Sequence, residues 1–163
     1  HFMQTNPLVK ILSYSTYTAI LLHIIVTIKL TIDSKRNRSI KYKVNKASVQ
    51  NTSSKYMGVL GTIILSFLII HLNDFWYKAH FEDITDICTL VVTKFQDINY
   101  VIIYEFAMLA IFLHLLHGFQ SSFQSLGLIT SSSRKYIKII GIAYALLIPM
   151  LFAIIPLWIY FNS

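Results

Sequence analysis

The chain has 163 residues, of which 55% are hydrophobic and 13% charged, and its mean hydropathy is +0.60. A soluble domain carries about 25% charged residues, so the composition argues against an ordinary soluble domain and against a disordered chain. The net charge is +7, but most basic residues fall in one stretch, so the charge does not indicate a nucleic-acid partner. The single cysteine, Cys88, excludes an internal disulfide and a multi-thiolate metal site.

Four long uncharged runs divide the sequence. They contain 18, 18, 28 and 25 residues and lie after Lys10, Lys55, Glu105 and Lys138. Roughly 20 apolar residues in a helix cross the hydrocarbon core, and a helix satisfies its backbone polar groups internally. The sequence therefore predicts an all-α transmembrane helical bundle. We expect a single membrane domain over 1–163, with helices at about 8–30, 57–77, 99–123 and 137–160.

The charges between the predicted helices indicate how the protein lies in the membrane. Residues 31–56 contain seven Lys or Arg and one Asp, whereas 78–98 contain two basic and four acidic residues. Residues 124–136 contain two basic residues and no acidic one. By the positive-inside rule the first and third connections are cytoplasmic and the second lies outside. The basic cytoplasmic loop 31–56 is also a candidate contact for anionic lipid headgroups or a soluble partner.

Histidine occurs in three of the four predicted helices, as His23, His71, His114 and His117. Polar side chains are costly inside a membrane and usually serve a site or pathway, and imidazole is the common protein ligand of haem iron. At helical rise, His23 lies roughly 10 Å and His114 roughly 13 Å from the inner end of its helix, so the two are predicted to bind one b-type haem. His71 lies roughly 9 Å from the opposite surface, without a partner at its depth.

Small residues surround both members of this predicted pair. His114 has Ala110 four residues before it and Gly118 four residues after it, and His23 has Ala19 before it at the same spacing. Such residues would let a flat macrocycle approach the helix, although they also serve direct helix–helix contact. Because the pattern occurs on two helices, each centred on a histidine of matched depth, haem binding is the favoured interpretation.

The remaining polar residues leave alternatives open. His117 lies one turn inward of His114 and is a candidate haem-propionate contact, an alternative iron ligand, or an interfacial polar residue. Asp74, Trp76 and Glu105 lie towards the outer side and are candidate quinone contacts, while ordinary interfacial residues are the alternative.

Several stretches carry a family resemblance: "HFMQTNP" at 1–7, "LLHIIVTIKL" at 21–30, "MGVLGTIILSFLIIHLNDFWYKAHF" at 57–81 and "FLHLLHGFQSSFQSLG" at 112–127. The chain resembles the cytochrome b558 subunit of succinate dehydrogenase and fumarate reductase, a five-helix membrane anchor with two haems. In that family the segment resembling "HFM" lies in the outer loop between helices I and II. The resemblance therefore implies that this sequence corresponds to helices II to V, without helix I.

The same resemblance implies roles for individual residues. His23 and His114 would be the axial ligands of the inner haem, since the family motif uses the first histidine of "HLLH" and so favours His114 over His117. His71 would be one ligand of the outer haem, whose second ligand lies on helix I. Phe112 stands where some relatives have a carboxylate, so the resemblance does not extend to a proton route through that group.

The implied function is that of an electron-transfer subunit which is not catalytic by itself. It would bind a flavoprotein and an iron–sulfur subunit at its cytoplasmic face, in a bacterial cell (inner) membrane that it crosses several times. Two haems b would carry electrons between succinate or fumarate and menaquinone. The alternatives are the cytochrome b of a hydrogenase or formate dehydrogenase, and a haem-free membrane scaffold or transporter fragment.

Overall fold

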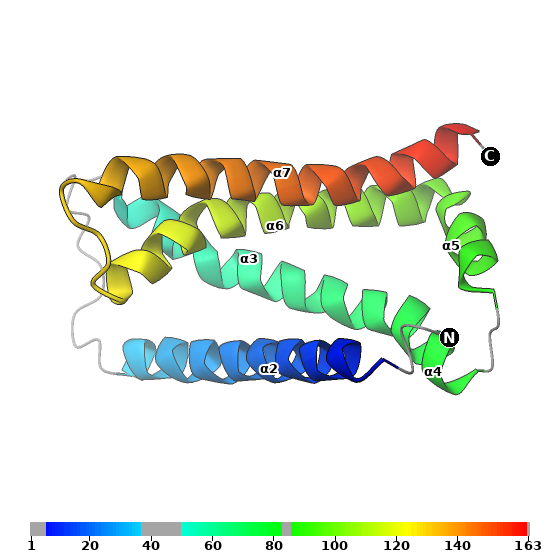
Figure 1. The fold of residues 1–163 in the computed structure, drawn as a ribbon, viewed down its shortest axis with the longest axis horizontal. Coiled ribbons are helices and arrows are strands. Elements are labelled where there is room, and N and C mark those ends of the chain that lie inside the picture. Colours follow the sequence, from blue (N-terminus) through cyan, green and yellow to red (C-terminus); the bar gives the residue numbers. More distant parts are fainter. Residues whose placement is uncertain (1–5, 37–49, 83–85, 163) are drawn as a thin grey trace. The chain divides into compact units, whose positions relative to one another are not determined.

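A computed structural model of the chain describes residues 6–36, 50–82 and 86–162 (Figure 1). Every regular element in these ranges is a helix. Four helical stretches are long and apolar enough to cross a membrane: Pro7–Ser34, Tyr56–Phe81, Ile98–Ser125 and Ser133–Asn162. Each of these contains one of the predicted spans. The prediction of an all-α membrane protein with four spanning helices is therefore confirmed.

The chain divides into two compact units, His1–Ala47 and Ser48–Ser163. The first contains helix α2 (Pro7–Arg36), which begins with proline directly after Asn6, whose side-chain oxygen accepts a hydrogen bond from the Leu8 amide at 2.9 Å. Hydroxyl groups along α2 donate to carbonyls four residues earlier, as Thr27 Oγ1 does to the His23 carbonyl at 2.6 Å. These hydroxyls are thus satisfied within the helix, which suits an environment without water.

The second unit contains the remaining elements. They are α3 (Gln50–His71), the π-helical turn η1 (Leu72–Tyr77), α4 (Lys78–Phe81), α5 (Ile87–Phe95), α6 (Ile98–Ser125) and α7 (Ser133–Asn162). Helices α6 and α7 pack along each other, and α3 packs against α6 (Figure 1). Gly127 has a φ of 70° directly after the C-cap of α6, a conformation that favours glycine and lets the chain turn back.

Small residues are buried on both α6 and α7. Gly141 and Ala145 on α7 are buried, as are Ala107 and Ala110 on α6. A Cβ added at Gly141 would lie only 2.7 Å from Cδ1 of Phe119 on α6, so the two helices meet at contact distance there. Small side chains of this kind permit close packing where lipid gives no hydrophobic driving force.

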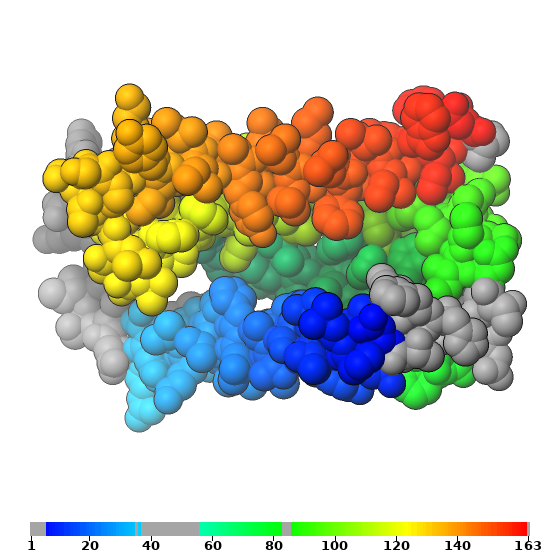
Figure 2. Space-filling view, viewed as in Figure 1, coloured from blue at the N-terminus to red at the C-terminus, as the bar shows by residue number. Residues whose placement is uncertain are grey.

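The outward sides of the helices carry many large apolar side chains. Helix α7 continues through its two buried prolines, Pro149 and Pro156, and runs along the top of the view in Figure 2. Its exposed side chains include Ile139, Leu147, Leu151 and Phe152. A surface so rich in large apolar residues is expected where a protein contacts hydrocarbon.

The connections differ from the prediction in length and content. Helix α2 extends to Arg36 and α3 begins at Gln50, so only 37–49 of the predicted basic loop stands between helices, and those residues lie outside the described ranges. The predicted loop 78–98 contains α4 and α5. Helix α5 begins after Asp86, whose carboxylate accepts a hydrogen bond from the Thr89 amide at 3.2 Å, a common N-cap arrangement.

Candidate functional site

An aromatic cluster joins α3, η1, α5 and α6 at one end of the second unit. We call this end, which carries α5, the α5 end. Tyr104 on α6 is 5% exposed. Its ring stands edge-on to Phe67 of α3 and to Phe95 of α5, with ring centroids 4.9 Å apart in both pairs. Phe75 of η1 also packs against this cluster. Edge-to-face contacts of this kind fix ring orientation, so the Tyr104 hydroxyl has a defined position.

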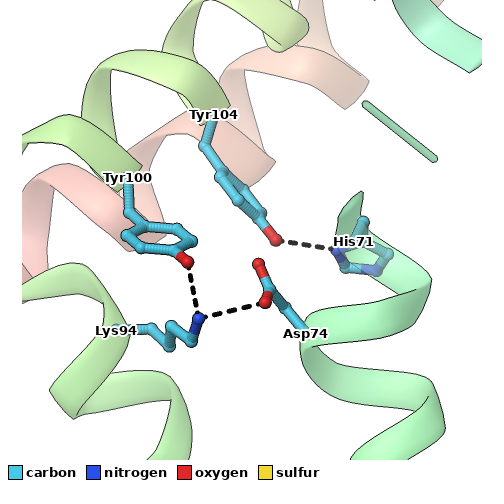
Figure 3. A network of polar contacts seen from close by, with 5 residues as sticks. All are labelled: His71, Asp74, Lys94, Tyr100 and Tyr104. Atoms are coloured by element: carbon cyan, nitrogen blue, oxygen red, sulfur yellow. Dashed lines mark hydrogen bonds and ion pairs between the residues drawn. The ribbon is translucent and has the colours of Figure 1, made fainter. Parts of the chain in front are cut away.

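A network of polar side chains lies beside the aromatic cluster (Figure 3). The Lys94 ammonium on α5 forms an ion pair with Oδ1 of Asp74 at 3.0 Å and donates to the Tyr100 hydroxyl at 2.7 Å. Asp74 is 5% exposed, and its second oxygen, Oδ2, is buried without a hydrogen-bond partner among the described residues. A buried carboxylate is stable only when it is paired, and Lys94 supplies the partner.

Asp74 owes its position to η1. This stretch, Leu72–Tyr77, continues α3 without a break but with π-helical hydrogen bonding, and Asp74 is its buried residue. Single π-helical turns inside longer helices occur frequently at functional sites. The turn therefore marks the α5 end as the best-supported candidate site in the second unit.

His71 precedes the π-helical turn and joins the network from α3. Its Nδ1 lies 3.4 Å from the Tyr104 hydroxyl, and its ring centroid lies 5.7 Å from that of Phe67 and 5.5 Å from that of Phe75. An imidazole that binds a metal through one nitrogen commonly uses the other for a hydrogen bond that sets its orientation. The arrangement thus suits iron ligation through Nε2.

An apolar groove begins beside His71. It runs between α3 and α6 with a volume of about 390 Å³, and Phe67, Ile70, Phe106 and Ala107 are among its lining residues. A second groove of about 480 Å³, lined by Tyr56, Leu60, Leu113 and His117 among others, lies between the same helices towards the start of α3. Apolar grooves with few polar groups suit flat hydrophobic cofactors.

The predicted ligands His23 and His114 lie in different units. His23 is on α2 in the first unit, and His114 is on α6 in the second. Their pairing on one iron stays a prediction. Ala110, four residues before His114, is already buried by packing within the second unit, so helix–helix contact accounts for this small residue. A Cβ on Gly118 would meet only Met57 Cε, at 3.9 Å.

His117 lines the second groove and interacts with its own helix. Its Nε2 lies 3.3 Å from the Ser121 hydroxyl, one turn further along α6. This contact engages the nitrogen that most often binds iron. It favours the polar-residue interpretation of His117 over direct ligation.

The three candidate quinone contacts have different surroundings. Asp74 belongs to the polar network, whereas Trp76 stacks on His80, with ring centroids 4.6 Å apart and planes inclined by 26°. His80 Nδ1 donates to the Trp76 carbonyl at 2.8 Å. Glu105 Oε1 is buried on α6 without a hydrogen-bond partner in the part of the chain that the structure describes. The structure shows no arrangement that unites these three residues.

Sequence reasoning missed Lys94, Tyr100 and Tyr104. The two tyrosines are four residues apart and therefore share a face of α6, which is a detectable pattern. Their partners could not be identified, because the position of Lys94 depends on how α5 folds back over the end of α3.

Comparisons with protein-family models, with curated proteins and with solved structures find no match for this chain.

Proposed function

We propose that the chain is a haem b-binding membrane anchor subunit of a succinate:quinone oxidoreductase, which passes electrons between an iron–sulfur subunit and membrane menaquinone. The observation that carries the proposal is the setting of His71. It stands half-buried in a helix able to cross a membrane, its Nδ1 faces the Tyr104 hydroxyl, and an apolar groove begins one residue away. Burial, ligand type and hydrogen bonding to the ligand are the means by which a protein holds and tunes a haem.

The residues present suit the cofactor in chemical type. An imidazole with one nitrogen engaged, aromatic neighbours and an apolar groove are what a haem requires at its axial position and around its macrocycle. When bound, the iron would supply one-electron transfer between its ferric and ferrous states. His71 would be one ligand of the outer haem, as the family resemblance implies.

His23 and His114 would hold the inner haem. Support for this pair comes from their matched depth in the sequence and from the resemblance. We further propose a flavoprotein and an iron–sulfur subunit as partners at the cytoplasmic face, next to the basic residues of 31–56. The location would be a bacterial cell membrane, and the subunit would not be catalytic by itself.

Haem content and spectra test the proposal directly. The full-length protein, purified with its partner subunits, is expected to show a reduced-minus-oxidised b-type spectrum that succinate can elicit. His23→Ala and His114→Ala should each remove the inner haem only, and His71→Ala the outer haem only. His117→Ala is the matched control and should retain both, because His117 Nε2 contacts Ser121.

Three outcomes would contradict the proposal in distinct ways. Purified protein without any haem would favour the scaffold or transporter alternative. A b-type spectrum that responds to hydrogen or formate, and not to succinate, would favour the other dehydrogenases. Unchanged haem content in all three alanine variants would show that the ligand assignment is wrong.

A further inference from the structure

We propose that Tyr104, supported by Asp74, is a positioning residue for His71 and lowers the reduction potential of the iron that His71 binds. The inference rests on the proposed function, since it concerns a haem held by His71. It assigns a role to a tyrosine and a carboxylate that otherwise have no part in ligation.

The Tyr104 hydroxyl has a fixed place in the structure. Its ring is packed edge-on between Phe67 and Phe95, and only 5% of the residue is exposed. From this position the hydroxyl lies 3.4 Å from His71 Nδ1. The aromatic cluster therefore holds the hydroxyl against one particular nitrogen of the imidazole.

Ligation determines the direction of this hydrogen bond. A neutral imidazole that binds iron through Nε2 carries its proton on Nδ1, so Nδ1–H donates and the tyrosine oxygen accepts. The Tyr104 hydroxyl then has its own proton to donate. It cannot donate to His71, and it needs an acceptor elsewhere.

We assign Asp74 as the acceptor that the Tyr104 hydroxyl would use once His71 binds iron. Figure 3 shows the Tyr104 hydroxyl and the Asp74 carboxylate pointing towards one another, with His71 on the other side of the hydroxyl. Asp74 Oδ2 is buried and has no hydrogen-bond partner among the described residues, while Oδ1 is held by Lys94 at 3.0 Å. The side chain is 8% exposed, so Oδ2 is an acceptor shielded from solvent and directed into the network.

In the proposed haem-bound state, four groups follow one another: the His71 imidazole, the Tyr104 phenol, the Asp74 carboxylate and the Lys94 ammonium. Each hydrogen bond in such a chain strengthens its neighbour by polarisation. A phenol that donates to a carboxylate is a better acceptor for Nδ1–H, and a ligand whose Nδ1–H is strongly bonded gives more electron density to its metal. More electron density favours the ferric over the ferrous state, which lowers the reduction potential.

Tyr104→Phe tests the proposal, because it removes the hydroxyl and keeps the packed ring. In membranes that contain the full-length protein with its partner subunits, a redox titration followed by haem absorbance should show the outer haem at a higher potential. The inner haem potential should not change. The low-spin electron paramagnetic resonance signal of the outer haem should also shift, because that signal reports on the orientation and basicity of the axial imidazole.

Tyr144→Phe is the matched control. Tyr144 lies on α7, is 45% exposed and packs against Phe119 on a different part of the unit, so loss of its hydroxyl should change neither potential. Asp74→Asn is the second variant. It keeps the size of the side chain and removes the charge, and it should raise the outer potential by less than Tyr104→Phe does.

Failure of this inference differs from failure of the proposed function. Wild-type protein without haem would overturn both. A wild type with two haems and a Tyr104→Phe variant with unchanged potentials and spectra would overturn only the inference. If Tyr104→Phe lost the outer haem altogether, the Asp74→Asn variant would decide. An unshifted reduction potential of the outer haem in Asp74→Asn would then overturn the inference, whereas an upward shift would support the inference.

Discussion

The Lys94 ammonium lies 3.0 Å from the Asp74 carboxylate, although 20 positions separate the two residues along the chain. One partner is on the connecting helix α5 and the other is in the π-helical turn at the end of α3. The Tyr100 hydroxyl, 2.7 Å from the same ammonium, adds α6 to the arrangement. A single lysine thus ties three elements together at the α5 end.

Removal of the Lys94 charge should destabilise the protein strongly. Lys94→Met leaves the Asp74 carboxylate buried without its counter-ion, and such a loss costs about 3 kcal/mol or more. The double variant Lys94→Met/Asp74→Asn should recover part of this loss, because no uncompensated charge remains. Reversible unfolding in mixed micelles measures the free energies.

Lys138→Met, at an exposed position on α7, is the control and should change stability by less than about 0.5 kcal/mol. Equal effects of Lys94→Met and Lys138→Met would contradict the prediction.

The same lysine should make stability depend on alkaline pH. Partial burial alone would lower the pKa of Lys94, but the hydrogen bonds to Tyr100 and Asp74 and the negative charge of Asp74 outweigh burial and raise it. Since the folded-state pKa exceeds the ordinary value of 10.5, the stabilisation is complete below that value and is lost as pH rises through the folded-state pKa. Unfolding free energy should therefore fall above about pH 10 more steeply in wild type than in Lys94→Met. Parallel pH profiles would show that the pair contributes nothing.

Asp86 should give the opposite response at acid pH. Hydrogen bonds from the Thr89 hydroxyl and then from the Thr89 amide lower the pKa of Asp86 below its ordinary value of 3.8. The stabilisation of α5 is thus complete above that value and is lost as pH falls through the folded-state pKa. Hydrogen exchange of the α5 amides should speed up in this range in wild type, speed up at all pH values in Asp86→Ala, and stay nearly constant in Asp86→Asn, which retains a capping side chain. Wild type and Asp86→Asn with the same pH dependence would contradict this account.

A methyl group at Gly141 should disturb the contact between α6 and α7. Its Cβ would lie 2.7 Å from Phe119, whose ring is held by Phe123 and Tyr144 at centroid distances of 4.9 and 5.7 Å. Overpacking of this kind costs about 1–3 kcal/mol. Gly61→Ala is the control: nothing lies within 4 Å of its added Cβ, and alanine in a helix gains about 0.5–1 kcal/mol over glycine. Thermal unfolding in detergent should lower the Tm of Gly141→Ala only, and equal Tm values would refute the prediction.

The spanning helices were predictable because charge is excluded from hydrocarbon. Each uncharged run supplies most of one helix that the structure shows, although the third run continues past the end of α6 at Ser125. The π-helical turn does not interrupt the second helix. The extent of α2 up to Arg36 was not predictable from the sequence. A helix can continue into water beyond the membrane, and the polar residues in that part do not indicate where the helix ends.

The candidate site was only partly predictable. Asp74 and His71 were identifiable because polar residues are rare in apolar runs. The sequence does not indicate which side chains these two residues contact in the folded protein. The ion pair with Lys94 required α5, a nine-residue helix in what the sequence suggested was a loop. Ala110 illustrates a different limit, because a small residue beside a histidine looks the same whether a macrocycle or a neighbouring helix covers it.

The π-helical turn also has a consequence for how the sequence can vary. Hydrogen bonds from residue i to i+5 accommodate one residue more than an α-helical path of similar length. Loss of one residue between Leu72 and Tyr77 could thus be absorbed by a return to α-helical bonding, with His71 kept in place. The same deletion earlier in α3 would rotate His71 by roughly 100° away from Tyr104. Homologous chains are therefore expected to differ in length at this turn and to keep a constant length in the helix before it.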